Sequence, residues 1–203
     1  MSNSLKNPQY TDNSICKCPR GTEFSTMKQR FYSLYETYIT RPGSEELRQW
    51  LEASTFDTDP SSTRFHGNYA GGLIEHSVNV YSRLCNLREV FGLSDVSDET
   101  IAIVSLLHDL CKIGKYKVEL RNVKTEAGWV QKPFYKFVDT LPFGYHGPAS
   151  VFLIQRFMKL SDEEIAAIAC HMGAYDRPTT DFSLQDVYQK YPLAYALHVA
   201  DCL

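Results

Sequence analysis

The clearest indication of chemistry in this sequence is His108-Asp109, which interrupts a run of apolar residues from Ile101 to Cys111. Such a run is typical of a buried helix, where an ionised carboxylate without a partner costs several kcal/mol. A metal cation would remove this cost, because imidazole and carboxylate groups both bind divalent transition metals. The alternative is an ion pair between Asp109 and Lys112, flanked by histidines that only fill the core.

Histidines recur in the apolar segments of the chain. A single histidine of this kind is usually a core residue, but five of the six lie in or beside apolar helical segments, which favours a site: His76, His108, His146, His171 and His198. Adjacent helical residues point about 100° apart, so His108 and Asp109 can share an ion only if other helices supply the remaining ligands. His76 and Asp201 are the first candidates. His198, on the same helical face as Asp201, either supports a ligand or belongs to the core.

Basic residues gather after the histidine–aspartate pair. Residues 112–136 contain seven lysines and arginines and two glutamates, a net charge of +5, although the whole chain carries -3 and the remainder therefore -8. Lys112, one turn after His108, could hold a phosphate oxygen, and the segment as a whole would attract an anionic substrate. The alternative is a solvated hairpin with lysines on its exposed face.

Hydrophobic periodicity predicts the elements that must position these residues. Helices are expected to begin near residues 25, 44, 73, 97, 148, 161, 183 and 192. The third should run from Leu73 to Phe91, and the fourth should pass through His108-Asp109 and end at Gly114. Between residues 116 and 138, apolar and polar residues alternate around Gly128, which predicts a small β-hairpin.

The predicted fold is therefore mostly α, a helical bundle with a β-hairpin insertion at about 116–138. We expect a flexible segment over 1–22 and a single domain over 23–203.

The 203 residues are 43% hydrophobic and 22% charged, and their mean hydropathy of -0.31 argues against a membrane protein. No leader is recognisable, so a cytoplasmic location is expected. The cysteines inside apolar runs should be reduced thiols, and Cys16 and Cys18 lack the further ligands of a zinc site.

Three motifs in order resemble the HD-domain superfamily of metal-dependent phosphohydrolases. They are Gly71-Gly72-Leu73-Ile74-Glu75-His76-Ser77, Leu106-Leu107-His108-Asp109-Leu110-Cys111-Lys112 and His198-Val199-Ala200-Asp201. The resemblance covers roughly His66 to Asp201, and the first motif is similar to the HD modules of bacterial 3'-to-5' exoribonucleases. Family members often have glycine where this chain has Cys111, a small change that leaves the ligands untouched.

The resemblance implies a helical HD fold in which His76, His108, Asp109 and Asp201 bind one divalent cation. His146 and His171 match the further histidines of binuclear members, with Asp109 bridging two ions. The resemblance also places His66 and Asn68 near the substrate, and we add Lys112 and Lys115 as predicted substrate-binding residues.

The prediction is a metal-dependent phosphohydrolase, a phosphodiesterase or nucleotidase. Two ions, of Mn, Fe, Co, Ni, Zn or Mg, would activate a water molecule, with Asp109 and Lys112 as the catalytic residues. The expected substrate is a phosphorylated small molecule, a nucleotide or a short oligonucleotide, with the ends of single-stranded nucleic acid as a further option. Two alternatives remain open: a di-iron HD-fold oxygenase acting on a small alcohol or phosphonate, and a non-catalytic nucleotide-binding module.

Overall fold

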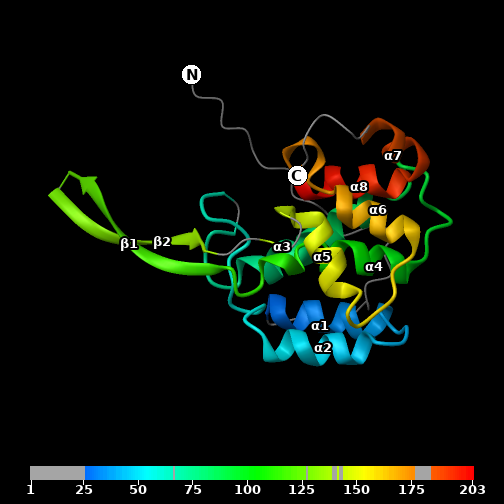
Figure 1. Cartoon of the computed structure of the whole chain (residues 1–203), viewed down its shortest axis with the longest axis horizontal. Coiled ribbons are helices and arrows are strands. Elements are labelled where there is room, and N and C mark those ends of the chain that lie inside the picture. Colours follow the sequence, from blue (N-terminus) through cyan, green and yellow to red (C-terminus); the bar gives the residue numbers. More distant parts are fainter. Residues whose placement is uncertain (1–25, 66, 127, 139–140, 142–143, 177–183) are drawn as a thin grey trace, which may run out of the picture.

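The structure is a computed structural model that describes residues 26–65, 67–126, 128–138, 141, 144–176 and 184–203. Cys16, Cys18, His66 and the predicted segment 1–22 lie outside these residues. The described residues form eight α-helices and one antiparallel β-hairpin (Figure 1), which confirms the predicted mostly α fold with a hairpin insertion. None of the described helices combines the length and the apolar character needed to cross a membrane.

The first two helices support the centre of the molecule. Helix α1 (Met27–Tyr38) begins after Thr26, whose hydroxyl accepts a hydrogen bond from the backbone N–H of Gln29, and α2 (Ser44–Ala53) follows Gly43. Helix α1 packs against α3 and α4, and in Figure 1 both α1 and α2 lie below these helices. The apolar face of α1 is buried, as its periodicity predicts.

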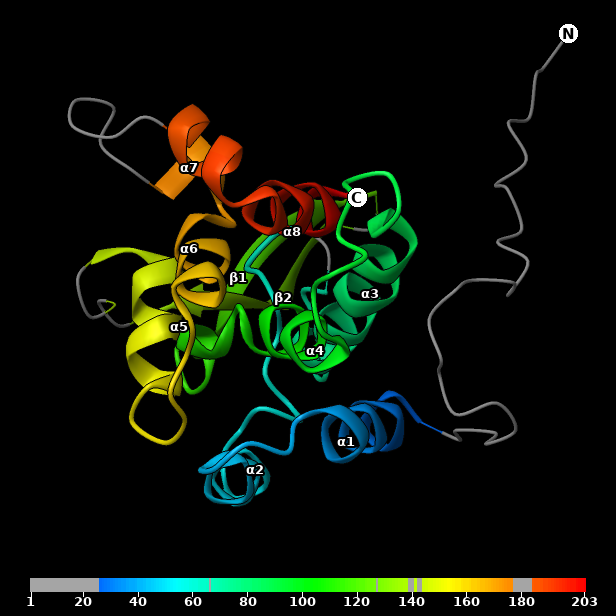
Figure 2. The same cartoon turned by 90° about the vertical axis from the view of Figure 1, so that its right-hand side faces the viewer.

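Three helices form the centre of the molecule. Helix α3 (Gly72–Leu87) contacts α4 (Asp98–Leu107) and α8 (Pro192–Cys202), and these neighbours lie beside it in Figure 2. Every residue of α4 from Ile101 to Leu107 is buried, so this helix is central, as its composition predicts. The core that these helices share also includes side chains from α1, α5 and α6.

Helix α3 is shorter than expected, because it ends at Leu87 and not at Phe91. The chain then turns, and the backbone N–H of Leu93 donates to the carbonyl of Arg88 at 2.8 Å. The guanidinium of Arg88 donates in turn to the carbonyl of Leu93 at 3.1 Å. Both contacts require the chain to fold back at Gly92, whose φ is 65°. A helix that continued past Leu87 would prevent them.

The C-terminal half of the chain adds further helices to this centre. Helix α5 (His146–Ile154) packs against α6 (Asp162–Cys170) and against the short 3-10 helix η1 (Leu110–Lys112). Ser161 and Glu164 form the predicted capping box at the start of α6. After the 3-10 helix η3 (Gly173–Asp176), α7 (Leu184–Lys190) precedes α8. Cys85, Cys111 and Cys170 are buried and form no disulfide among the described residues, in line with the reduced thiols that the sequence predicts.

The hairpin consists of β1 (Tyr116–Thr125) and β2 (Gly128–Phe137), close to the predicted range. Its register runs from Tyr116 opposite Phe137 to Thr125 opposite Gly128. The two strands pair only with each other among the described residues, and they extend away from the helices (Figure 1). The base of the hairpin adjoins η1, so it begins directly after the histidine–aspartate pair and its lysines.

Gly147 fixes how closely α5 approaches α6. A Cβ at this position would lie 2.5 Å from the carbonyl oxygens of both Ile168 and Ala169. We expect Gly147→Ala to lower the free energy of unfolding by about 1 to 3 kcal/mol, because the backbones must separate. Urea unfolding would measure this. Gly92→Ala, where a Cβ meets nothing within 4 Å, tests backbone strain alone, and a larger loss there would contradict the close-approach argument.

Candidate metal centre

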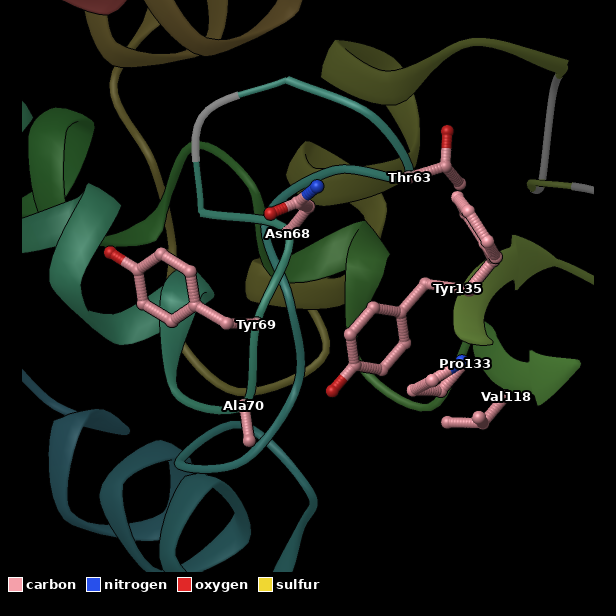
Figure 3. Close-up of a pocket in the computed structure, with 8 residues that line it drawn as sticks. Thr63, Asn68, Tyr69, Ala70, Val118, Pro133 and Tyr135 are labelled. Atoms are coloured by element: carbon pink, nitrogen blue, oxygen red, sulfur yellow. The ribbon is translucent and has the colours of Figure 1, made fainter. Parts of the chain in front are cut away.

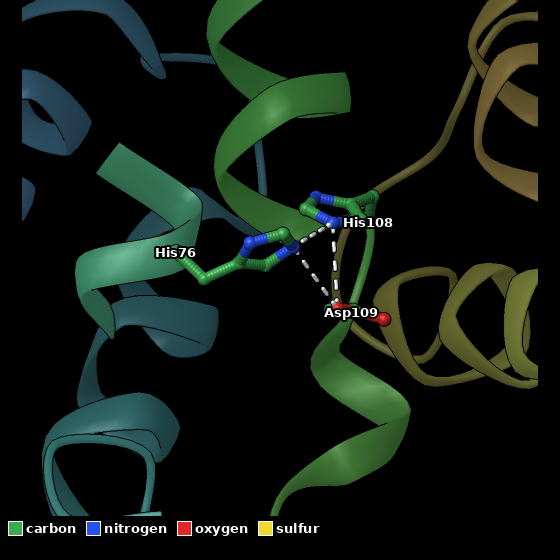
Figure 4. Close-up of side chains that lie close together, drawn as sticks. All are labelled: His76, His108 and Asp109. Atoms are coloured by element: carbon green, nitrogen blue, oxygen red, sulfur yellow. Dashed lines mark hydrogen bonds and ion pairs between the residues drawn. The ribbon is translucent and has the colours of Figure 1, made fainter. Parts of the chain in front are cut away.

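His108 and Asp109 lie where α4 ends. His108 is the residue that caps α4 at its C-terminus, and Asp109, with φ -109° and ψ 18°, has left the helix before η1 begins. The expectation that both residues occupy adjacent positions within one helix was therefore wrong. Because the backbone breaks here, the two side chains converge, with His108 Nε2 at 3.4 Å from Asp109 Oδ2 (Figure 4).

Side chains from several helices meet at this break. Nε2 of His76, on α3, lies 3.1 Å from Nε2 of His108, 3.5 Å from Oδ2 of Asp109 and 2.9 Å from Oδ1 of Asp201 on α8. Nε2 of His171, directly after α6, lies 3.6 Å from Oδ1 of Asp109. These residues form two potential ligand groups that share His108: one with His76 and Asp109, the other with His171 and Asp201.

The structure thus brings together five of the six predicted ligands. Within the part of the chain that the structure describes, His146 belongs to neither ligand group. It is the first residue of α5, and its ring centroid lies 6.4 Å from that of Phe137 at the base of the hairpin. Its role as a ligand stays a prediction.

Two of the histidines are held by the ends of their own helices. Nδ1 of His108 donates to the carbonyl of Ser105 at 2.8 Å, and Nδ1 of His171 donates to the carbonyl of Ile168 at 2.7 Å. The last carbonyls of a helix lack intrahelical partners, so a histidine at the end can use them. Donation from Nδ1 leaves the lone pair on Nε2, which points to the centre and can bind a metal.

The donor atoms at the centre fit a divalent cation. Asp109 Oδ1 and His171 Nε2 are buried and have no hydrogen-bond partner among the described residues, because their separation of 3.6 Å is too long for a hydrogen bond. Unsatisfied buried polar atoms are rare, and a cation bound between them would satisfy both. Imidazole and carboxylate donors suit Mn, Fe, Co, Ni or Zn.

The electrostatics also favour positive charge at this position. Burial opposes the charged form of His108, but the carboxylates of Asp109 and Asp201 outweigh it and raise the pKa of this imidazole to about 10. Burial likewise opposes ionisation of Asp201, yet the imidazoles of His108 and His76 hold the pKa of its carboxyl well below the usual range. A metal cation would take the place of these protons.

Lys112 lies beside Asp109. Its Nζ is 2.6 Å from Asp109 Oδ2, and the two side chains are 14% and 2% exposed. Burial opposes the charge of Lys112, but the adjacent carboxylate raises the pKa of its ammonium above the usual range. The ion pair that the sequence offered as an alternative to a metal site therefore exists, together with the converging ligands.

The remaining predicted substrate residues lie around the base of the hairpin. The backbone of Lys115 joins η1 to the hairpin, accepting from the N–H of Val138 at 3.0 Å. Asn68 borders a pocket of about 300 Å³ between the loop before α3 and the hairpin (Figure 3). The residues around the pocket are Thr63, Asn68, Tyr69, Ala70, Val118, Pro133, Phe134 and Tyr135. His66, in the same loop, lies outside the described residues.

His198 supports the centre from outside it. Its Nδ1 donates to the carbonyl of His171 at 2.6 Å, and a Cβ on Gly173 would lie 2.8 Å from its ring. The residue therefore holds the turn that follows α6 and positions His171. Its spacing from Asp201 placed both on one helical face, but the sequence could not indicate this backbone contact.

Metal binding should stabilise the fold, because its ligands come from helices that are distant in sequence. A free metal concentration about 100 times the Kd adds about 2.7 kcal/mol per site, which corresponds to about 5 to 11 °C in Tm for a chain of this size. Calorimetry with MnCl₂ and then with excess EDTA would measure the shift. An unchanged Tm for every divalent metal tried would contradict a metal centre.

Comparison with known families identifies the chain. The sequence model of the HD domain matches residues 73–203, about two thirds of the chain, a range that contains all five converging residues. Searches among curated proteins and among solved structures gave no match. The chain therefore belongs to the HD-domain family, whose members are generally metal-dependent phosphohydrolases.

Proposed function

We propose that this protein hydrolyses a phosphomonoester or phosphodiester bond in a nucleotide or short oligonucleotide. The observation that carries the proposal is the convergence of three imidazoles and two carboxylates on one buried point, where Asp109 Oδ1 and His171 Nε2 lack hydrogen-bond partners among the described residues. A purely structural cluster would be expected to satisfy its own buried polar atoms. These donors are suited to hold two cations.

Each residue has a distinct task in this proposal. His76, His108, His171, Asp109 and Asp201 would hold the metal, which when bound activates water and polarises a phosphoryl oxygen. The Nδ1 contacts of His108 and His171 keep their Nε2 atoms directed at the centre. His146 is proposed as a further ligand from the start of α5, which packs against both η1 and α6.

Lys112 is proposed to bind the phosphate. An ammonium has three donors, and among the described residues it uses only one, toward Asp109. The remaining two can bind a phosphate oxygen as charge-assisted hydrogen bonds. Lys115, three residues further along the chain, adds positive charge to the same approach.

The pocket between the loop before α3 and the hairpin is proposed to take the nucleoside. The loop leads directly into the helix that bears His76, and the hairpin starts just after Lys112 and Lys115. The pocket therefore borders the loop that precedes the helix of His76 and the hairpin that follows the two lysines. Its aromatic and aliphatic lining, with the amide of Asn68 and the hydroxyl of Thr63, suits a planar heterocycle with polar edges.

A substrate panel tests the function. Mononucleotides, cyclic nucleotides and short oligonucleotides would be incubated with the protein and Mn, Mg, Co, Ni or Zn, and released phosphate, nucleoside or nucleotide would be measured. We expect hydrolysis of at least one class, abolished by EDTA. Oxygen consumption with an iron-loaded protein and no phosphoester cleavage would instead favour the oxygenase alternative, and binding of nucleotides without turnover would favour a non-catalytic module.

Lys112→Ala should separate phosphate binding from metal binding. Loss of one hydrogen bond to a charged group costs about 1.5 to 3 kcal/mol, so we expect kcat/KM to fall about tenfold to a hundredfold while metal content is retained. Initial rates, metal content and Tm would be measured on the metal-loaded variant. Lys124→Ala, at an exposed position near the hairpin turn, is the control and should change little.

A different result would assign Lys112 a structural role. Its ion pair with Asp109 compensates a carboxylate that is 2% exposed. If Lys112→Ala lost metal or stability while its rate per bound metal stayed unchanged, the residue would serve the fold and not the substrate.

A further inference from the structure

The β1–β2 hairpin carries charge and apolar groups on different faces. Successive side chains of a strand point to opposite faces, and the register pairs residues of β1 and β2 directly. Within 117–121 and 132–136, one face therefore carries Lys117, Glu119, Arg121, Lys132, Phe134 and Lys136. We name these six residues the basic face. They belong to the part of the molecule that extends from the helices (Figure 1).

On the basic face, cations of one strand lie directly across from cations of the other. Lys117 lies opposite Lys136, and Arg121 lies opposite Lys132. Like charges directly across a pair of strands destabilise it, so this arrangement is unfavourable for the hairpin alone. Glu119 compensates part of the charge, with its carboxylate 2.9 Å from Lys136 Nζ and 3.9 Å from Arg121 Nη2.

Two of these cations lack a counter-ion in the part of the chain that the structure describes. Lys117 and Lys132 are exposed and make no ion pair among the described residues. The excess charge is local, because residues 112–136 carry +5 and the remainder of the chain -8. An anionic partner with more than one negative charge would relieve the repulsion on this face.

An aromatic ring lies between the two pairs of cations. Phe134 is opposite Glu119, and the guanidinium carbon of Arg121 lies 5.4 Å from the centroid of its ring. Phe134 also lines the pocket beside the hairpin, whose other hairpin residues, Val118, Pro133 and Tyr135, point to the opposite face of the strands. Cations on both sides of an aromatic ring are typical of surfaces that bind single strands, where phosphates contact the cations and bases stack on the ring.

We infer that the basic face binds single-stranded nucleic acid. The phosphates would contact Lys117, Arg121, Lys132 and Lys136, and an unpaired base would stack on Phe134. An acidic protein surface, including that of a second copy of this chain, would satisfy the cations but gives no role to the ring between them. The inference extends the proposed function, but binding can be measured without cleavage and so does not depend on it.

The test uses the full chain loaded with Mn²⁺ and fluorescent phosphorothioate single strands of about 12 nucleotides, a length within the range that single-strand binding sites cover. Binding of DNA and RNA strands would be followed by anisotropy over a series of salt concentrations. With four phosphate contacts, the slope of log K against log salt should be about -3. The double variant Lys117→Gln, Lys132→Gln should reduce this slope to about half and weaken binding roughly tenfold at low salt.

Stacking and charge can be separated in the same assay. Phe134→Leu should weaken binding about fivefold or more without changing the salt slope, because it removes a ring and no charge. Lys124→Gln combined with Lys159→Gln changes the net charge equally. Lys124 is on the opposite face of the hairpin and Lys159 lies between α5 and α6, so this control should retain both affinity and slope.

Three outcomes would overturn the inference. If wild type and the Lys117→Gln, Lys132→Gln variant bound equally well, the basic face would not be the contact surface. If duplex bound as tightly as single strand, no unpaired base would stack on Phe134. Salt-sensitive self-association that this variant abolishes, without oligonucleotide binding, would assign the face to a second copy of the chain. Mononucleotide hydrolysis by the same variant, expected to be unchanged, would report separately on the proposed function.

Discussion

Asp109→Asn is expected to abolish hydrolysis, with a fall of more than about 100-fold, and to reduce bound metal. Removing a residue that only supports a metal ligand typically lowers metal affinity or activity 10–100-fold, and Asp109 is proposed to be a ligand itself. Its Oδ2 lies 3.4 to 3.5 Å from His108 and His76, and its Oδ1 lies 3.6 Å from His171, so it joins the two ligand groups. The neutral amide keeps the size of the side chain but removes the negative charge that a cation needs. Initial rates and elemental analysis on the same preparation would measure both effects.

Asp95→Asn provides the matched control for this variant. Asp95 is exposed, and it lies in the turn before α4, away from the converging ligands. It undergoes the same chemical change and should keep full activity and metal content. If Asp109→Asn retained a large part of the wild-type rate on any substrate, the metal assignment would be wrong.

The second large effect concerns the number of ions. We expect about two divalent ions per chain, because five converging ligands and His146 exceed the four that one tetrahedral zinc requires. His146→Ala and His171→Ala should each remove about one ion and most of the activity. Gln155→Ala, an exposed position at the end of the helix that begins with His146, controls for damage to α5. Elemental analysis of metal-saturated protein would give the counts.

A single ion per chain, unaffected by either histidine variant, would make the site mononuclear. Loss of metal in His171→Ala alone would agree with the grouping of His171 with His108 and Asp201, and would exclude His146 as a ligand. Both results would leave the HD-domain assignment unchanged, since it rests on residues 73–203 as a whole.

The regular elements followed from local patterns in the sequence. Apolar periodicity and capping residues such as Ser161 predict helices, and alternation around Gly128 predicts the hairpin, because both depend on neighbours within a few residues. The convergence of His76, His108, Asp109 and Asp201 was also expected, since a buried carboxylate needs a partner and the ordered motifs resemble a family with that ligand set.

What the sequence could not predict depends on contacts between distant segments. The apolar run through Cys111 continues without a helix breaker, yet the chain leaves α4 at His108, where the imidazole donates a hydrogen bond to the carbonyl of Ser105. The early end of α3 depends on Arg88 reaching the carbonyl of Leu93 beyond a turn. His198 supports His171 through a backbone carbonyl, and side-chain spacing carries no information about such a contact.

The hydrogen bonds from Nδ1 of His108 and His171 to their own helices bear on the entropy of metal binding. Both rings are fully buried, and each is fixed by a carbonyl three residues earlier, so each has one orientation before any cation arrives. Immobilising a free side chain costs about 0.5 to 1.5 kcal/mol, a loss that these two ligands incur when the chain folds. Cation binding should then require no reorientation of these two rings.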